Sequence, residues 1–253
     1  MRRLLLGMIA CLCAPAAIAA APAPAAAAIG PDPAIRFFKP PASEQPGLRG
    51  RARAGDMQAQ IALARQCLAQ NDGDCAVRWL TEANARGNAE AQYLLGLLYA
   101  RGDGIAQDLQ QGAYFLGKAA GQGEVHAQYR LGVMLSDADF DDPGIDKVPA
   151  ELQRGEQLLH KAALAGYAPA QYHMGLLCLR AGADCTAQAD GYLEQAAAQG
   201  QVDAAYMVAS RAVHRGDAAA ARAAALRLQR LAPAGSRYAD DAQRLLGEIP
   251  ASP

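Results

Sequence analysis

Apolar residues recur along most of the chain at the spacing of one face of a helix. Over residues 91–101 they follow a helical period that stops at Gly102 and Gly104, which predicts a helix followed by a glycine-rich loop. A second amphipathic run covers residues 108–122 and is stopped by Gly123. The pattern therefore predicts a module of two helices joined by a loop, with a tight glycine turn at its end.

One phrase returns along the chain and marks where each module begins. It reads GDMQAQ, GNAEAQ, GEVHAQ, GYAPAQ and GQVDAA, starting at Gly55, Gly87, Gly123, Gly166 and Gly200. These glycines stand 32, 36, 43 and 34 residues apart, and Gly235 follows 35 residues after the last. Periods of this size are typical of solenoids built from two-helix repeats. We therefore predict an all-α solenoid over residues 50–232, with a capping helix and tail in residues 233–253.

Aligning the repeats on their glycines shows which positions are constant. Two columns hold only alanine or glycine, and one is bulky. The first small column is Ala59, Ala91, Ala127, Ala170 and Ala204; the second is Ala64, Gly96, Gly132, Gly175 and Ala209; the bulky one is Ile61, Tyr93, Tyr129, Tyr172 and Tyr206. Because a side chain larger than methyl would separate close helices, we expect helix contacts at the small columns and core at the bulky column.

The second repeat resembles a known family. Residues 91–123 are similar to the pattern A-x-x-x-L-G-x-x-Y, a glycine-rich loop and W-Y-x-K-A-A-x-x-G of the Sel1-like repeat (SLR) family, relatives of the tetratricopeptide repeats. The matching residues are Ala91, Leu95, Gly96, Tyr99, Lys118, Ala119, Ala120 and Gly123. The resemblance covers roughly residues 54–217, although Phe115-Leu116 stands where Trp-Tyr is usual and the fifth repeat lacks the glycine loop. It implies an α/α superhelical solenoid that acts as an adaptor in envelope assembly, signalling or secretion.

The first residues predict export. A basic start, an apolar stretch and a small-residue cleavage motif are typical of a signal peptide, which we place at residues 1–21. Lipid attachment at Cys11 is disfavoured because the apolar stretch before it is short. Residues 22–49 are rich in proline and alanine and predict an unstructured linker, in which Phe37-Phe38 contacts either a partner or the repeats. We expect a periplasmic or secreted protein without stable membrane insertion.

Four cysteines remain after the predicted cleavage. An even number in an exported chain suggests disulfides. Cys67 and Cys178 share a column near the end of a first helix, and Cys75 and Cys185 follow 8 and 7 residues later, at the start of the second helix. We therefore predict two bridges within repeats, Cys67–Cys75 and Cys178–Cys185. Zinc is the alternative, but these spacings lack the short intervals of structural zinc sites. The arrangement is similar to the secreted, cysteine-rich branch of the SLR family.

The charge balance and the remaining motifs argue against nucleic-acid binding and against catalysis. The 24 basic and 25 acidic residues nearly balance, which excludes a strongly basic nucleic-acid binder. Penicillin binding and weak β-lactamase activity have been attributed to cysteine-rich SLR relatives, yet no serine here stands in an S-x-x-K motif. The glycines form no phosphate-binding motif, and the histidines lack metal-ligand spacing. We predict a protein that is not an enzyme and binds no cofactor or metal. The alternative is a binding protein or hydrolase directed at cell-wall material, peptidoglycan or a β-lactam.

The third repeat carries an acidic insertion. Its aspartates are Asp137, Asp139, Asp141, Asp142 and Asp146. The D-x-D-x-D start is similar to a calcium loop, but Asp142 replaces the required glycine and Val148 stands where a bidentate glutamate is needed. We interpret residues 137–146 as a solvated insertion, and binding of a basic partner there stays open.

Three columns on the first helix vary between repeats, and we call them together the variable stripe. They lie three, seven and ten residues after each repeat glycine, which places them along one helix face. The stripe comprises Glu90, His126, Pro169 and Asp203; Leu94, Arg130, His173 and Met207; and Leu97, Val133, Leu176 and Ser210. In solenoids of this kind the first helix lines the concave surface. One hypothesis is that Arg130 and His173, flanked by Glu90 and Asp203, form part of a groove for a peptide or a partner's helix. The other is that these side chains are merely solvated.

Overall fold

The computed structural model describes residues 47–136, 151–182 and 185–249. Within these ranges the chain forms helices and no strands, so the predicted all-α class is confirmed. The predicted signal peptide, Phe37-Phe38 and the acidic insertion at residues 137–146 lie outside the described residues. The linker prediction lies outside them up to residue 46.

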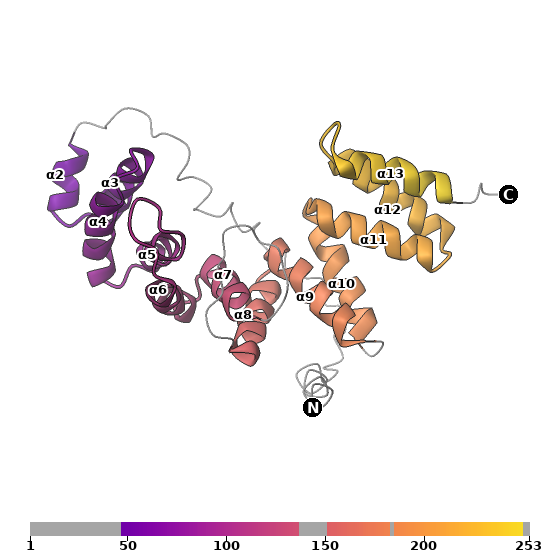
Figure 1. The fold of residues 1–253 in the computed structure, drawn as a ribbon, viewed down its shortest axis with the longest axis horizontal. Helices are drawn as coiled ribbons and strands as arrows, with labels where there is room; N and C mark the ends of the chain where they lie inside the picture. Colours follow the sequence, from indigo (N-terminus) through magenta and orange to yellow (C-terminus); the bar gives the residue numbers. More distant parts are fainter. Residues whose placement is uncertain (1–46, 137–150, 183–184, 250–253) are drawn as a thin grey trace. The chain divides into compact units, whose positions relative to one another are not determined.

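The helices follow one another as pairs (Figure 1). They are α2 (Leu48–Arg53), α3 (Met57–Ala69), α4 (Gly73–Ala85), α5 (Ala89–Arg101), α6 (Leu109–Gly121), α7 (Val125–Leu135), α8 (Leu152–Leu164), α9 (Ala168–Ala181), α10 (Thr186–Ala198), α11 (Val202–His214), α12 (Ala218–Leu231) and α13 (Arg237–Glu248). The described helices divide into two compact units, the first ending at Ala162 and the second beginning at Ala163. Each unit is described by itself below.

Backbone conformation explains why each repeat begins with a glycine that is often followed by a polar residue. The glycines at 55, 87, 123, 166, 200 and 235 all have φ between +72° and +90°, a region that side chains other than glycine rarely adopt. The residue after the glycine then caps the next helix in several repeats. The Asp56 carboxylate accepts from the Ala59 N–H at 3.1 Å, and the Asn88 side chain accepts from the Ala91 N–H at 2.8 Å. The glycine ends one helix and its neighbour starts the next.

Close approach of the two helices in each repeat confirms the second small column. A Cβ built on Gly96 would lie 2.6 Å from Cγ of Leu116, and one on Gly132 would lie 2.8 Å from Cγ of Leu159. The same contact occurs in the fourth repeat, where a Cβ built on Gly175 would lie 2.8 Å from Cγ of Leu193. Since real Cβ contacts are not this short, a methyl group does not fit without movement. Residues of the first small column are also fully buried.

The leucines that fill these contacts form a column that the sequence alignment had not singled out. Each stands seven residues before a repeat glycine and is at most 6% exposed. The column is Leu48, Leu80, Leu116, Leu159, Leu193 and Leu228. The bulky column is core as expected for Ile61, Tyr93 and Tyr129, whereas Tyr172 and Tyr206 are half-buried and pack at the edge of the core of the second unit.

The predicted linker is too long at its end. Helix α2 begins at Leu48, inside the range assigned to the linker, and buries Leu48 and Ala52 against α3. Nε2 of Gln60 donates to the Ala52 carbonyl at 3.0 Å. Leu48 belongs to the leucine column, so α2 occupies the place of the last turns of a second helix. Helix α2 is only 6 residues long, which is too short to show a helical period. The proline and alanine content of the preceding residues therefore decided the linker prediction.

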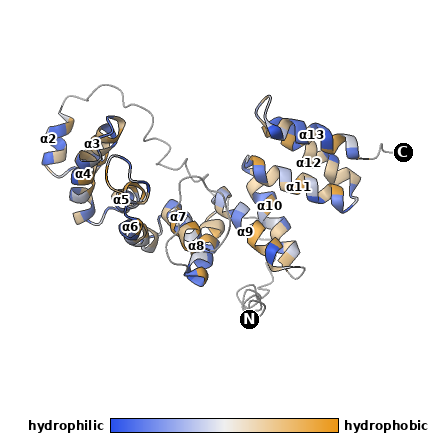
Figure 2. Cartoon of the chain, in the orientation of Figure 1, coloured by the Kyte–Doolittle hydropathy of each residue, from blue (hydrophilic) through white to orange (hydrophobic). Residues whose placement is uncertain are grey.

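Helix α13 is the last helix of the described residues. Helix α13 packs on α12 and α11, and buries Ala242 and Leu245 (Figure 1). Nine residues after Gly235, where other repeats have glycine or alanine, stands the exposed Arg244. A further second helix therefore has no close-packing surface on α13, which is mostly hydrophilic (Figure 2).

The half-buried Glu156 on α8 provides a pH-dependent prediction. Burial raises the pKa of this carboxyl. A raised pKa means that the folded state prefers the protonated acid, so ionisation costs stability as the pH rises through the folded pKa. We expect Glu156→Gln to stabilise the protein at pH 7, by less than about 1 kcal/mol because solvent screens a partly exposed group.

The advantage of Glu156→Gln should vanish below the ordinary glutamate pKa of about 4.3. Thermal unfolding at pH 7 and at pH 3.5 measures both points. Glu248→Gln, at an exposed position of α13, is the control. An equal gain at both pH values would show that burial of the charge is not the cause.

Candidate partner-binding face

In the first unit, polar residues of the variable stripe already have partners within the chain. Nη2 of Arg65 lies 2.5 Å from Oε1 of Glu90, an ion pair between α3 and α5. His126 places Nδ1 2.7 Å from Oε1 of Glu124, and its ring centroid lies 6.0 Å from that of Tyr93. The stripe in this unit is thus held in place by the neighbouring repeats.

Apolar members of the stripe in the first unit are buried. Leu94 is 0% exposed, Leu97 4% and Val133 1%. Leu94, although a member of the variable stripe, is therefore a core residue of the first unit. The guanidinium of Arg130 lies 5.8 Å from the ring centroid of Tyr129 and is half-buried. Helical spacing predicts a shared face for these residues but does not predict their exposure.

In the second unit the stripe is more open. Asp203 and Met207 on α11 are half-buried, as are Pro169 and Leu176 on α9. His173 is 7% exposed, and its ring centroid lies 5.8 Å from that of Tyr172. The open stripe positions of this unit therefore lie on α9 and α11.

Aromatic side chains surround Asp203. The Tyr238 hydroxyl donates to Oδ1 of Asp203 from the first turn of α13, and the rings of Tyr206 and Tyr238 lie 6.0 Å apart. Nη2 of Arg237 donates to the Tyr238 hydroxyl at 2.9 Å. Burial, and after it the charge of Asp203, raises the pKa of Tyr172 to about 12. The helices α9, α11 and α13 thus bring phenols, a carboxylate and a guanidinium together.

Our sequence reasoning missed Tyr238 and Arg237 as members of this cluster. Tyr238 stands three residues after Gly235, in the same column as Asp203 after Gly200. That shared position was the available signal. Prediction of residues 233–253 as a cap and tail does not by itself indicate a role for Tyr238 in this cluster.

Few other chemical groups gather. Within residues 47–136, 151–182 and 185–249, no three histidine, cysteine or acidic side chains come close enough to hold a metal ion. None of the helices in the described part of the chain is both long and apolar enough to cross a membrane.

Comparison with known proteins places the fold. No family model matches the chain. The crystal structure of c5321, a protective antigen of uropathogenic Escherichia coli that displays an SLR fold, is similar with a TM-score of 0.63 and 25% identity. The similarity covers 80% of this chain but only 43% of the antigen's chain. A Sel1 repeat protein from Oxalobacter formigenes is similar with a TM-score of 0.58 and 21% identity, over 71% of this chain and 75% of its own.

The chain therefore has the fold of Sel1-like repeat proteins. The resemblance noted over residues 91–123 is thereby confirmed at the level of the fold. An SLR array is a repeat scaffold for protein–protein interaction.

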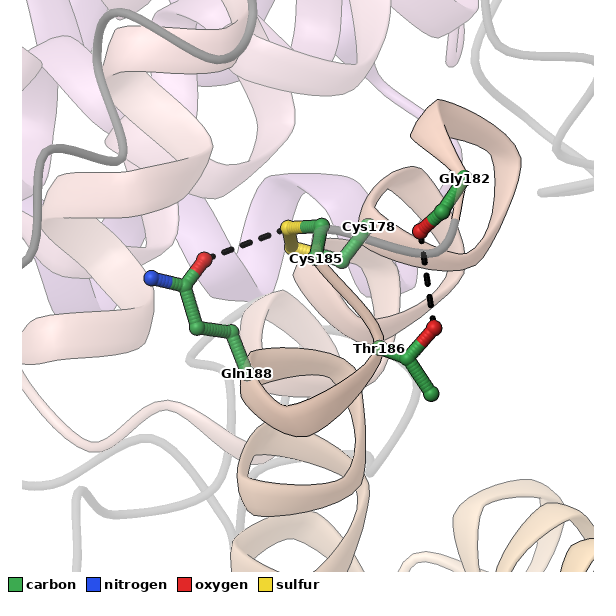
Figure 3. The surroundings of a disulfide bond; sticks show 5 residues. All are labelled: Cys178, Gly182, Cys185, Thr186 and Gln188. Carbon is green, nitrogen blue, oxygen red and sulfur yellow. Dashed lines mark hydrogen bonds between the residues drawn. A yellow bond between two sulfur atoms is a disulfide. The ribbon is translucent and has the colours of Figure 1, made fainter.

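The two cysteine pairs of the chain lie at disulfide distance, as predicted. Their Cα atoms are 5.7 Å apart for Cys67–Cys75 and 5.1 Å apart for Cys178–Cys185. Each pair joins the end of a first helix to the start of the second helix of the same repeat. Figure 3 shows the second pair, where Oε1 of Gln188 lies 3.2 Å from Sγ of Cys185.

A buried glutamine column explains the recurring AQ of the SLR phrase. Nε2 of Gln128 and Nε2 of Gln171 each donate at 3.3 Å to the carbonyl eight residues earlier, at the end of the preceding helix, as Gln60 does to Ala52. Gln171 also accepts from Nε2 of Gln199 at 2.8 Å. These amides connect one repeat to the next.

Replacing Gln171 tests the glutamine column. Gln171→Ala removes side-chain hydrogen bonds in a buried position, and a net hydrogen bond is worth about 0.5–1.5 kcal/mol. We expect the free energy of unfolding to fall by about 1–2 kcal/mol in chemical denaturation. Gln229→Ala, at an exposed site of α12, should change it little. Equal effects of the two variants would contradict a connecting role for the column.

Proposed function

We propose that this SLR protein is an exported, periplasmic scaffold that binds a protein or peptide partner along the variable stripe. In this role it acts as an adaptor in envelope assembly, signalling or secretion. One observation carries the proposal: the columns that pack the helices stay constant between repeats, while the stripe changes its chemistry from repeat to repeat. Repeat-specific side chains on a constant backbone are what recognition of one particular partner requires.

The cysteines support the export part of the proposal. Disulfides persist in oxidising spaces such as the bacterial periplasm and are rare in the cytosol. Two pairs at bonding distance fit that compartment. Recovery of the chain in the fraction released by osmotic shock, with both bridges formed, tests it. Recovery only inside the spheroplasts would contradict export.

Charge reversal tests the stripe. Arg130 lies on the stripe on α7, whereas Arg154 is an exposed residue of α8 that lies outside it. We expect Arg130→Glu to lose a partner that wild type captures by crosslinking in the native cell. Arg154→Glu, which changes the net charge equally, should retain that partner. Capture of the same proteins by both variants would contradict binding through the stripe.

A direct assay separates this proposal from a role in cell-wall chemistry. The purified protein is expected neither to turn over a chromogenic β-lactam nor to pellet with peptidoglycan. Turnover or saturable pelleting would favour the cell-wall alternative and would contradict the scaffold proposal.

A further inference from the structure

Asp203 is a half-buried carboxylate without an ion pair in the described part of the chain. Its Oδ1 accepts a hydrogen bond from the neutral Tyr238 hydroxyl, and no lysine, arginine or histidine nitrogen lies within 4.0 Å. Arg237 reaches it only through that hydroxyl, and its guanidinium lies over the Tyr238 ring at 4.9 Å from the centroid. An ionised carboxylate has acceptor sites beyond the one that Tyr238 occupies.

The same column in the first unit shows what Asp203 lacks. Glu90 stands three residues after its repeat glycine, as Asp203 does, and is paired with Arg65 of the preceding repeat at 2.5 Å. Arg65 stands ten residues after Gly55. The residue ten after Gly166, in the repeat that precedes Asp203, is Leu176. Within the described residues, Glu90 therefore has a cation in direct contact, whereas Asp203 has only the Arg237 guanidinium beyond the Tyr238 hydroxyl.

The surroundings of Asp203 favour a cation as the missing group. A positive charge is attracted to the faces of aromatic rings. The Tyr206 ring lies beside Tyr238, whose own ring already carries the Arg237 guanidinium. A partly buried carboxylate gains more from a charged donor than from a neutral one. An ammonium or guanidinium group that contacts Asp203 as Arg65 contacts Glu90 would interact favourably with both the carboxylate and the aromatic rings.

We propose that Asp203 and the tyrosines around it form a recognition site for a lysine or arginine side chain of the protein partner. The inference rests on the proposed function, since it names the chemistry of a partner bound by the stripe. It adds that the partner carries a basic residue opposite α11.

Titration with a small lysine compound tests the site on the full mature chain. The chain is labelled with carbon-13 in its tyrosine rings, and the signals of Tyr172 and Tyr238 are assigned with Tyr→Phe variants. N-acetyl-lysine N-methylamide is added, and the norleucine and glutamate analogues serve as matched probes. We expect saturable shifts of both tyrosine signals with the lysine compound only.

Three variants test the role of charge. Asp203→Asn keeps the shape of the side chain and is expected to weaken lysine binding about tenfold, the change that corresponds to about 1.4 kcal/mol. Leu176→Arg supplies the internal cation that Arg65 gives to Glu90, and should abolish binding. Glu194→Gln removes a carboxylate of α10 that pairs with Arg227 at 2.6 Å, away from these tyrosines, and should leave binding unchanged. Helical circular dichroism shows that each variant is folded.

Three results would overturn the proposal. Equal shifts with the norleucine compound would show apolar contact only, and shifts with the glutamate compound alone would assign the site to an anion on Arg237. Lysine binding that survives Asp203→Asn unchanged would remove the carboxylate from the site. These three results concern only the site at Asp203 in the second unit. Partner binding by the stripe is tested separately, by capture with Arg130→Glu in the first unit.

Discussion

Leu116→Ala is expected to lower the free energy of unfolding by about 2–5 kcal/mol, the range for a buried leucine truncated to alanine. Leu116 is 0% exposed and fills the space between α6 and the glycine of α5. Because the contact recurs along the leucine column, the cavity lies at a junction that the array uses in several repeats. Urea denaturation followed by helical circular dichroism measures the change. The exposed Leu226→Ala is the control and should have an effect of at most about 0.5 kcal/mol.

A second substitution shows whether the contact with Gly96 is the cause. Gly96→Ala alone should destabilise by about 1–3 kcal/mol, because its Cβ would overlap Leu116. Gly191→Ala, in the interior of α10 with open space around it, should instead stabilise by about 0.5–1 kcal/mol. Combining Gly96→Ala with Leu116→Ala should cost less than the sum of the two, since the new methyl group partly fills the cavity. Strict additivity would mean that the two positions do not share this space.

The sequence predicts this packing well because a repeated backbone repeats its steric constraints. A position that must stay small, such as Gly96, stays small in every copy, so five copies in one chain substitute for an alignment. The turn glycines follow for the same reason, since each copy needs a positive φ at one place.

Features that occur once are harder to predict. Helix α2 has no copy of itself and is too short to show a period, so only its place in the leucine column identifies it. Exposure is also not periodic, since Leu94 is buried while Met207, in the same column, is half-buried. Which stripe residues are open depends on the side chains of neighbouring repeats. The setting of Asp203 depends on Tyr238, which lies 35 residues away on the capping helix.

Removal of the Cys178–Cys185 bridge is expected to lower the free energy of unfolding by about 2–3 kcal/mol, because a bridge of this short loop restricts the unfolded chain. Cys178→Ala with Cys185→Ala, measured by chemical denaturation, gives the value. Wild type treated with a reductant loses both bridges, so its free energy of unfolding should be lower than that of this variant. The additional decrease, caused by loss of Cys67–Cys75, should be of similar size. The second repeat has Tyr99 in the cysteine column, with its ring stacked 5.8 Å from Phe115, so reduction leaves its helix pair unchanged. Four free thiols in unreduced mass spectrometry, or an unfolding curve that reductant does not move, would contradict the bridges as a source of stability. Each bridge joins the end of a first helix to the start of the second, whereas the stack in the second repeat joins the end of α5 to the middle of α6.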